Sequence, residues 1–161
     1  ILINNYDLND VKNQWQSIIS YVPQDIFLMD DTLKNNIIGN INLEHRKKDY
    51  ENAINFSGLK NLEETLKNDS IGEKGKKLSS GQIKRIGIAR AIYKKNAKIL
   101  IFDEVTANLD NHSENEIMEK IIKLSQKFTI IFISHNMNLS KYFNNVLKLE
   151  NKNITRINVK Q

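Results

Sequence analysis

Two adjacent acidic residues, Asp103 and Glu104, directly follow an apolar run at residues 99–102. A buried strand that ends in two carboxylates can place one of them near a magnesium ion and the other near a water molecule that attacks a phosphate. Upstream, residues 78–82 read Leu-Ser-Ser-Gly-Gln and precede a helical pattern. Backbone N–H groups at the start of a helix attract anions such as phosphate. Together, the two features predict the chemistry of a nucleoside triphosphatase.

Two further polar residues, Gln24 and His135, also follow apolar runs. Gln24 comes directly after Pro23, and its uncharged amide could contact a magnesium ion or its water and then swing away. His135 ends the run at residues 132–134, where a single histidine is more often structural than catalytic. This pattern alone does not distinguish a structural role of His135 from a catalytic one.

The strands that must position these side chains are predicted from the apolar pattern. Residues 18–22 are apolar and β-branched and stop at Pro23, which predicts a strand that ends at a rigid turn. Residues 98–102 and 128–133 predict two short strands, and the helix between them predicts a right-handed crossover and a parallel pairing. Two weaker strands are expected at 146–149 and 154–159, after a short helix at 139–143.

The helices are predicted from apolar residues at helical spacing. Short amphipathic helices are expected at 32–38, 47–56 and 59–66. A longer helix is expected at 81–94, with Ile83, Ile86, Ala89 and Ile92 or Tyr93 on one face.

Another long helix is expected at 111–127, after the acidic pair. Ser113 and Glu116 have the spacing of a capping box at its start. Glu116 with Lys120, and Glu119 with Lys123, are predicted to pair on its outer face.

The order of these motifs resembles the ATP-binding cassette (ABC) family. The matching segments are Gln24 for the Q-loop glutamine, 78–82 for the signature Leu-Ser-Gly-Gly-Gln, Asp103-Glu104 for Walker B, 107–110 for the D-loop and His135 for the switch histidine. The resemblance spans nearly the whole chain and implies an α/β fold with a P-loop NTPase-like parallel sheet core, partial in this chain. Residues 1–31 and 97–161 would belong to the core, and about 32–96 would form the inserted ABC helical subdomain with the signature. Residues 1–161 would thus be one partial nucleotide-binding domain.

The resemblance also implies ATP and Mg²⁺ as the bound groups and a role for each motif residue. Glu104 would be the general base, and His135 would contact the γ-phosphate. Asp103 and Gln24 would hold Mg²⁺, partly through water. The nucleotide-binding residues that would act in trans, on ATP held by a partner domain, are Leu78, Ser79, Ser80, Gly81, Gln82 and Asp110. Ser80 stands where the family has the first glycine of a pair, and because serine is small we expect altered affinity rather than lost binding.

Partners are implied by the same resemblance. The signature acts across a dimer, so a second nucleotide-binding domain is expected, in a homodimer or a heterodimer. Residues 71–75, with Glu73, resemble the exporter loop that touches the coupling helices of the membrane domain. We therefore expect a transmembrane domain fused upstream and a location on the cytoplasmic face of the cell membrane.

A Walker A loop, Gly, four residues, then Gly-Lys and Ser or Thr, is absent from the 161 residues. The only Gly-Lys step is Gly75-Lys76, and Lys77 follows it. The chain starts with Ile1, and residues 1–3 resemble the strand that lies shortly after Walker A in the family. The expectation is the C-terminal part of a longer protein, inactive as an isolated fragment.

Composition limits the classes of protein and of binding partner that remain. The net charge is +5, yet the basic residues are scattered and no aromatic series accompanies them, so nucleic acid is not an expected partner. The chain has no cysteine and no apolar run of the roughly 20 residues that span a bilayer. Two alternatives stay open: a soluble ABC ATPase that does not transport, and a truncated, non-catalytic fragment. The interval between Gln24 and Leu78 is too short for the coiled coil of the DNA-repair members.

Overall fold

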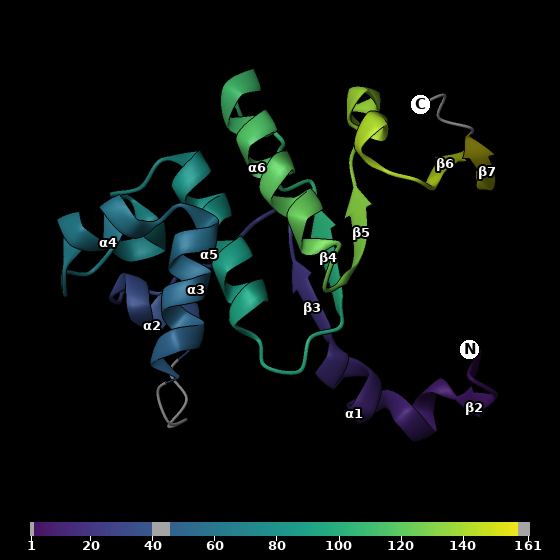
Figure 1. Cartoon of the computed structure of the whole chain (residues 1–161), viewed down its shortest axis with the longest axis horizontal. Helices are drawn as coiled ribbons and strands as arrows, with labels where there is room; N and C mark the ends of the chain where they lie inside the picture. The colour runs from purple at the N-terminus through teal and green to yellow at the C-terminus, as the bar shows by residue number, and fades with distance from the viewer. Residues whose placement is uncertain (1, 40–45, 158–161) are drawn as a thin grey trace.

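The centre of the molecule is a sheet of three parallel strands in the order β3 (Ile19–Val22), β4 (Ile99–Asp103) and β5 (Thr129–Ile133). A computed structural model describes residues 2–39 and 46–157. Tyr21 lies opposite Ile101, which in turn lies opposite Ile131. All three strands therefore end at the same edge (Figure 1), as the crossover rule predicts.

One face of this sheet is covered by two helices, α5 (Ser80–Tyr93) and α6 (Asn111–Leu124). The sheet residues of this core include Val22, Leu100 and Phe102, each no more than 1% exposed. The helix residues packed against them are Ile88, Ala91, Ile117, Ile121 and Leu124. This core holds the strand ends in place under the polar residues that follow them.

A second core lies among the helices α2 (Leu33–Ile38), α3 (Lys47–Ser57) and α4 (Lys60–Leu66), beside the sheet in Figure 1. These helices occur where the helical spacing predicts them. Their buried residues include Leu33, Ile37, Ala53, Ile54 and Leu59. Helix α5 contributes to this core as well.

Helix α5 buries the apolar face expected for it, and a second face that the sequence analysis did not identify. Ile86 and Ala89 lie in the core with α2 and α3, whereas Ile88 and Ala91 lie in the core with the sheet. The helix is buried on two sides because it runs between the two cores. Alanine and glycine on the second side carried little of the apolar pattern from which the face was predicted.

Helix α6 also corrects one prediction. Its N-cap is Asp110, whose carboxylate accepts hydrogen bonds from the backbone N–H groups of His112 and Ser113 at 3.0 Å each. The predicted capping box of Ser113 and Glu116 is therefore wrong, because Ser113 is already inside the helix. The Glu116–Lys120 pair is confirmed at 2.9 Å, but it does not lie on the outer face, because Arg85 of α5 also binds Glu116. The salt bridges of the described residues include none between Glu119 and Lys123.

The ends of the chain form smaller elements. At the N-terminus, β1 (Leu2–Ile3) and β2 (Tyr6–Asp7) pair antiparallel and lead into α1 (Leu8–Ile18). The sequence prediction missed α1, although apolar residues at 8, 11, 15 and 18 have helical spacing. At the C-terminus, the 3-10 helix η2 (Met137–Tyr142) precedes the antiparallel pair β6 (Val146–Glu150) and β7 (Asn153–Ile157). Positions 158 and 159 of the predicted last strand lie outside the described residues.

No helix within residues 2–39 and 46–157 is both long enough and apolar enough to cross a membrane.

Candidate functional site

The parallel strands bring the predicted polar residues to one edge of the sheet. Asp103 ends β4 and Glu104 follows it, Gln24 comes two residues after β3, and His135 comes two residues after β5. Because parallel strands carry their carboxyl ends to the same edge, residues far apart in sequence become neighbours there. This edge is the candidate functional site.

Glu104 is held in place by the segment that follows β5. Its backbone N–H donates to the carbonyl of Ile133 at 3.0 Å, and its Oε1 accepts a hydrogen bond from the backbone N–H of His135 at 2.9 Å. Its φ of 50° is in the left-handed region, which is costly for a residue with a side chain and is found at functional sites. The Glu104 side chain is only 12% exposed, so its carboxylate is oriented and partly screened from solvent.

His135 contacts Glu104 through its backbone more closely than through its ring. The distance from Nε2 to Glu104 Oε1 is 3.5 Å, and the imidazole is fully exposed. The ring therefore projects from the strand edge and is accessible to a ligand.

Asp103 has a partner that the sequence reasoning missed. The Tyr21 hydroxyl donates a hydrogen bond to Asp103 Oδ2 at 2.7 Å. That hydrogen bond, with smaller effects of burial and of the Asp103 charge, raises the pKa of Tyr21. The alternation of side chains along a strand could have indicated this contact. Tyr21 lies opposite Ile101, and Asp103, two residues after Ile101, points to the same face of the sheet.

Gln24 has an exposed side chain that forms no hydrogen bond with the described residues, while its backbone carbonyl accepts a hydrogen bond from Lys84 Nζ. Burial lowers the pKa of Lys84, and the charges of Asp25 and Glu104 oppose this. Lys84 was also missed from the sequence, because no local pattern shows that its side chain reaches the end of β3. A cation from α5 thus lies at the same edge as the acidic pair.

The signature residues form the start of α5. Ser79 is the N-cap, and a capping box joins it to Gln82: Gln82 N–H donates to Ser79 Oγ at 3.2 Å, and Ser79 N–H donates to Gln82 Oε1 at 2.8 Å. Ser80 and Gly81 follow in the first helical turn, where backbone N–H groups have no partner within the helix. No hydrogen bond or ion pair of the described residues joins this turn to Asp103, Glu104 or His135.

Leu78 and two further predicted residues lie apart from the strand ends. Leu78 N–H donates to the carbonyl of Gly75 at 2.8 Å, in the turn that leads into α5. Asp110 serves as the cap of α6, and the backbone and hydroxyl of Ser113 are the main reason that its pKa is lowered. Glu73 lies in the 3-10 helix η1 (Glu73–Gly75), exposed and 3.0 Å from Lys76 Nζ.

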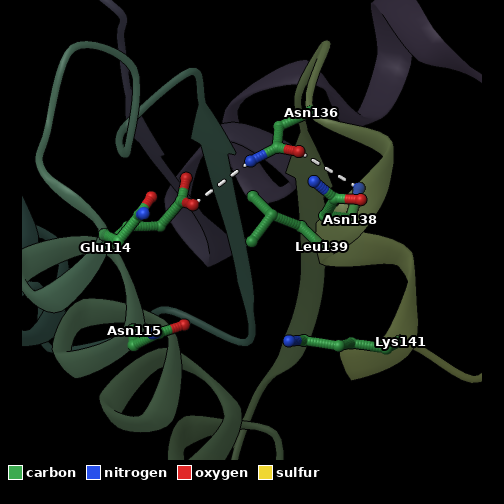
Figure 2. Close-up of a pocket in the computed structure, with 7 residues that line it drawn as sticks. Glu114, Asn115, Asn136, Asn138, Leu139 and Lys141 are labelled. Carbon is green, nitrogen blue, oxygen red and sulfur yellow. Dashed lines mark hydrogen bonds between the residues drawn. The ribbon is translucent and has the colours of Figure 1, made fainter.

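A polar cavity of about 400 Å³ lies next to the segment that follows His135, between α6 and η2 (Figure 2). Asn136 Nδ2 donates to Glu114 Oε2 at 3.1 Å across this cavity, and its Oδ1 accepts from the backbone N–H of Asn138 at 3.1 Å. The residues around it also include Asn111, Asn115, Leu139 and Lys141. These contacts tie the segment after β5 to the start of α6.

Comparisons with known proteins agree with this arrangement. The sequence profile of the ABC transporter family matches residues 1–107. The chain is 35% identical over 150 residues to the ATP-dependent lipid A-core flippase 2 of Colwellia psychrerythraea, covering 91% of this chain and 25% of that protein. It is 36% identical over 141 residues to the ATP-dependent lipid A-core flippase of Francisella tularensis subsp. holarctica, covering 85% of this chain and 23% of that protein.

A solved structure of a bacterial Atm1-family ABC exporter with ATP bound superimposes with a TM-score of 0.81 at 28% identity, over 94% of this chain and 27% of that chain. The chain thus spans about a quarter of the length of the curated relatives it matches. The ordered motifs, the parallel sheet with its helical group and these matches lead to one conclusion: the chain belongs to the ABC transporter family.

Proposed function

We propose that this chain is the ATP-binding and ATP-hydrolysing part of an ABC exporter. The observation that carries the proposal is the meeting of Asp103, Glu104, Gln24 and His135 at one sheet edge, where Glu104 is held by the backbone of His135. An oriented, partly screened carboxylate beside an exposed imidazole suits a site that positions a water molecule against a phosphate.

The residues at this edge fit Mg²⁺ bound together with a nucleotide. Among the described residues, no group of three or more His, Cys, Asp or Glu could hold a metal ion by itself. Mg²⁺ does not need such a cage, since it keeps several waters and takes one or two carboxylates plus substrate phosphates. Asp103 and Gln24 would hold it, and when bound it would neutralise negative charge on the phosphates.

Glu104 and His135 would act on the attacking water and the γ-phosphate. Glu104 would accept a proton from the water as general base, with its carboxylate kept in orientation by the His135 N–H at 2.9 Å. The exposed ring of His135 would donate a hydrogen bond to a γ-phosphate oxygen.

The residues away from the strand ends suit a site completed by a second domain. No hydrogen bond or ion pair of the described residues joins 78–82 or Asp110 to Glu104, yet Ser80 and Gly81 carry free N–H groups at the start of a 14-residue helix. We propose that this turn binds the γ-phosphate of ATP held by a second nucleotide-binding domain, and that Asp110 lies at the junction of the two domains.

The whole protein would use ATP binding and hydrolysis to drive export. Glu73, exposed in η1, is the residue we propose to contact the membrane domain. The relatives are full-length flippases, so we propose a transmembrane domain fused upstream and a position on the cytoplasmic face of the membrane.

The substitution Glu104→Gln in the purified protein that contains this chain tests the proposal. Loss of the general base should lower ATP turnover by about 10²- to 10⁴-fold, while ATP binding and a closed, ATP-bound dimer persist. Phosphate release and retention of labelled ATP report the two properties. Glu119→Gln, an exposed glutamate on α6 without an ion pair among the described residues, is the matched control. Rapid turnover in Glu104→Gln would remove Glu104 as the base.

A further inference from the structure

A buried amide, Asn36, organises the loop between Gln24 and helix α2. The residue is 1% exposed, although asparagine is rarely buried without partners. Its Oδ1 accepts from the backbone N–H of Met29 at 2.9 Å, and its Nδ2 donates to the carbonyls of Met29, Asp31 and Thr32 at 3.1, 3.3 and 3.0 Å. The side chain therefore closes residues 29–32 onto the start of α2.

Arg90, on α5, binds both Asn36 and the residue Phe27, which comes shortly before the segment 29–32. Its Nε donates to the backbone carbonyl of Asn36, its Nη2 donates to Asn36 Oδ1 at 3.0 Å, and its Nη1 donates to the carbonyl of Phe27 at 2.6 Å. Burial lowers the pKa of Arg90, and no carboxylate of the described residues forms a salt bridge with it. Burying the Arg90 guanidinium costs desolvation free energy, and no opposite charge offsets this cost. Its hydrogen bonds to the neutral oxygens must therefore supply the stabilisation.

The same side of α5 contacts the chain just before Phe27. A Cβ atom at Gly87 would lie 2.4 Å from Ile26 Cδ1 and 2.9 Å from Val22 Cγ1, so only glycine allows this approach. One turn earlier, Lys84 donates to the carbonyl of Gln24. Lys84, Gly87 and Arg90 are spaced by three residues, which places them along one side of the helix.

We propose that Arg90 is a positioning residue, which acts through Asn36 and the carbonyl of Phe27 to set the path of residues 24–36 and hence the place of Gln24 at the strand edge. This inference rests on the proposed ATP hydrolysis. The exposed amide of Gln24 forms no hydrogen bond with the described residues, so the backbone that carries it determines where it lies. Only two residues lie between Gln24 and Phe27, which leaves the backbone little freedom between the held carbonyl of Phe27 and the amide of Gln24.

The substitution Arg90→Met tests the proposal in the purified protein that contains this chain. It keeps an unbranched, apolar stem and removes all three donor groups. We expect kcat for ATP hydrolysis to fall by about 10- to 100-fold, the size of effect that a displacement of about 1 Å can produce, while KM for ATP changes by less than about threefold. Arg46→Met is the matched control: Arg46 donates to the carbonyl of Tyr93 at 2.7 Å at the end of α5, far along the helix from Gln24.

A double-mutant cycle separates positioning from a general loss of structure. If Arg90 acts through Gln24, Arg90→Met should lower kcat at least tenfold less in a Gln24→Ala background than in the wild type. A merely structural residue would lower kcat equally in both backgrounds, and that result would overturn the inference. If Arg90→Met does not fold, Arg90→Lys, which keeps the charge but not the planar fork, is carried through the same cycle with a smaller expected loss.

The wild-type protein distinguishes this inference from the proposed function. Absence of ATP hydrolysis in the wild type, or hydrolysis that Glu104→Gln leaves unchanged, would refute the proposed function. Hydrolysis that depends on Glu104, with kcat unaffected by Arg90→Met, would refute the role of Arg90 alone.

Discussion

Glu116 is the centre of a charged network away from the strand ends. Arg85, from α5, donates to its two carboxylate oxygens at 3.1 and 2.6 Å, and Lys120 donates to Oε1 at 2.9 Å. These hydrogen bonds, that of Arg85 being the larger cause, lower the pKa of Glu116 from 4.5 to about 2. The network joins α5 to α6, so one carboxylate connects the two helices that cover the sheet.

Glu116→Gln should reduce the stability of the chain in a pH-dependent way. A carboxylate whose pKa is depressed on folding stabilises the fold above its unfolded value near 4.5, and that stabilisation is lost as the pH falls towards about 2. Because the side chain is 38% exposed, we expect a loss of only about 1 kcal/mol at pH 7. Thermal unfolding followed by circular dichroism should show the difference shrinking between pH 5 and pH 3. A difference from wild type that stays constant over this range, or an equal loss in Glu119→Gln, would contradict the assignment.

At the scale of whole elements, helix α5 connects the functional residues. Its first turn is the signature, its middle packs against β3 and its far side contributes to the core with α2 and α3. The contact with β3 depends on Gly87, where a Cβ atom would meet Val22 and Ile26 below van der Waals distance. Gly81, in the same helix, has only ordinary contacts at 3.8 and 3.9 Å.

Two Gly→Ala substitutions in α5 should therefore have opposite effects. Alanine favours a helix over glycine by about 1 kcal/mol, so Gly81→Ala should be neutral or slightly stabilising. Gly87→Ala gains the same propensity but must displace Val22, which is 1% exposed, and overpacking costs about 1–3 kcal/mol. We expect a net loss of up to about 2 kcal/mol from these two terms, measured as the midpoint of urea unfolding. Equal midpoints for the two variants would show that α5 can move away from β3 at no cost.

At the scale of the whole molecule, the sheet has two unlike faces. One is covered by α5 and α6, whereas on the other Tyr21, Ile131 and Ile133 are 54%, 46% and 47% exposed. Parallel strands are ordinarily covered on both faces. In the described residues, the strand ends thus border an apolar surface as well as the polar edge.

The 161-residue chain by itself should not hydrolyse ATP. It contains no Walker A loop to bind the phosphates in cis, and in the described residues no hydrogen bond or ion pair joins its own signature turn to Glu104. We expect phosphate release at millimolar ATP and Mg²⁺ that does not exceed the release by its Glu104→Gln variant. Turnover that Glu104→Gln abolishes would show that these residues alone provide a complete catalytic site.

The sequence alone determined the residues at the ends of the strands and the types of most elements. Asp103, Glu104 and His135 follow apolar runs whose composition is local, and strands of this kind joined by a helix pair in parallel for reasons of chirality. The meeting of these residues at one edge was therefore predictable. The start of α6 was not, because Asp110 and Ser113 are both acceptable caps and only the backbone path before the helix selects between them.

Only the tertiary structure decided which distant residues meet. The contacts of Tyr21 with Asp103, of Lys84 with Gln24 and of Arg90 with Asn36 join positions more than 50 residues apart. They depend on strand register and on how closely α5 approaches β3, and that approach is set by Gly87, which carries no apolar side chain to appear in a periodic pattern. A local sequence pattern indicates which side of a helix or strand is buried. Which other element that side packs against depends on the tertiary structure of the whole chain.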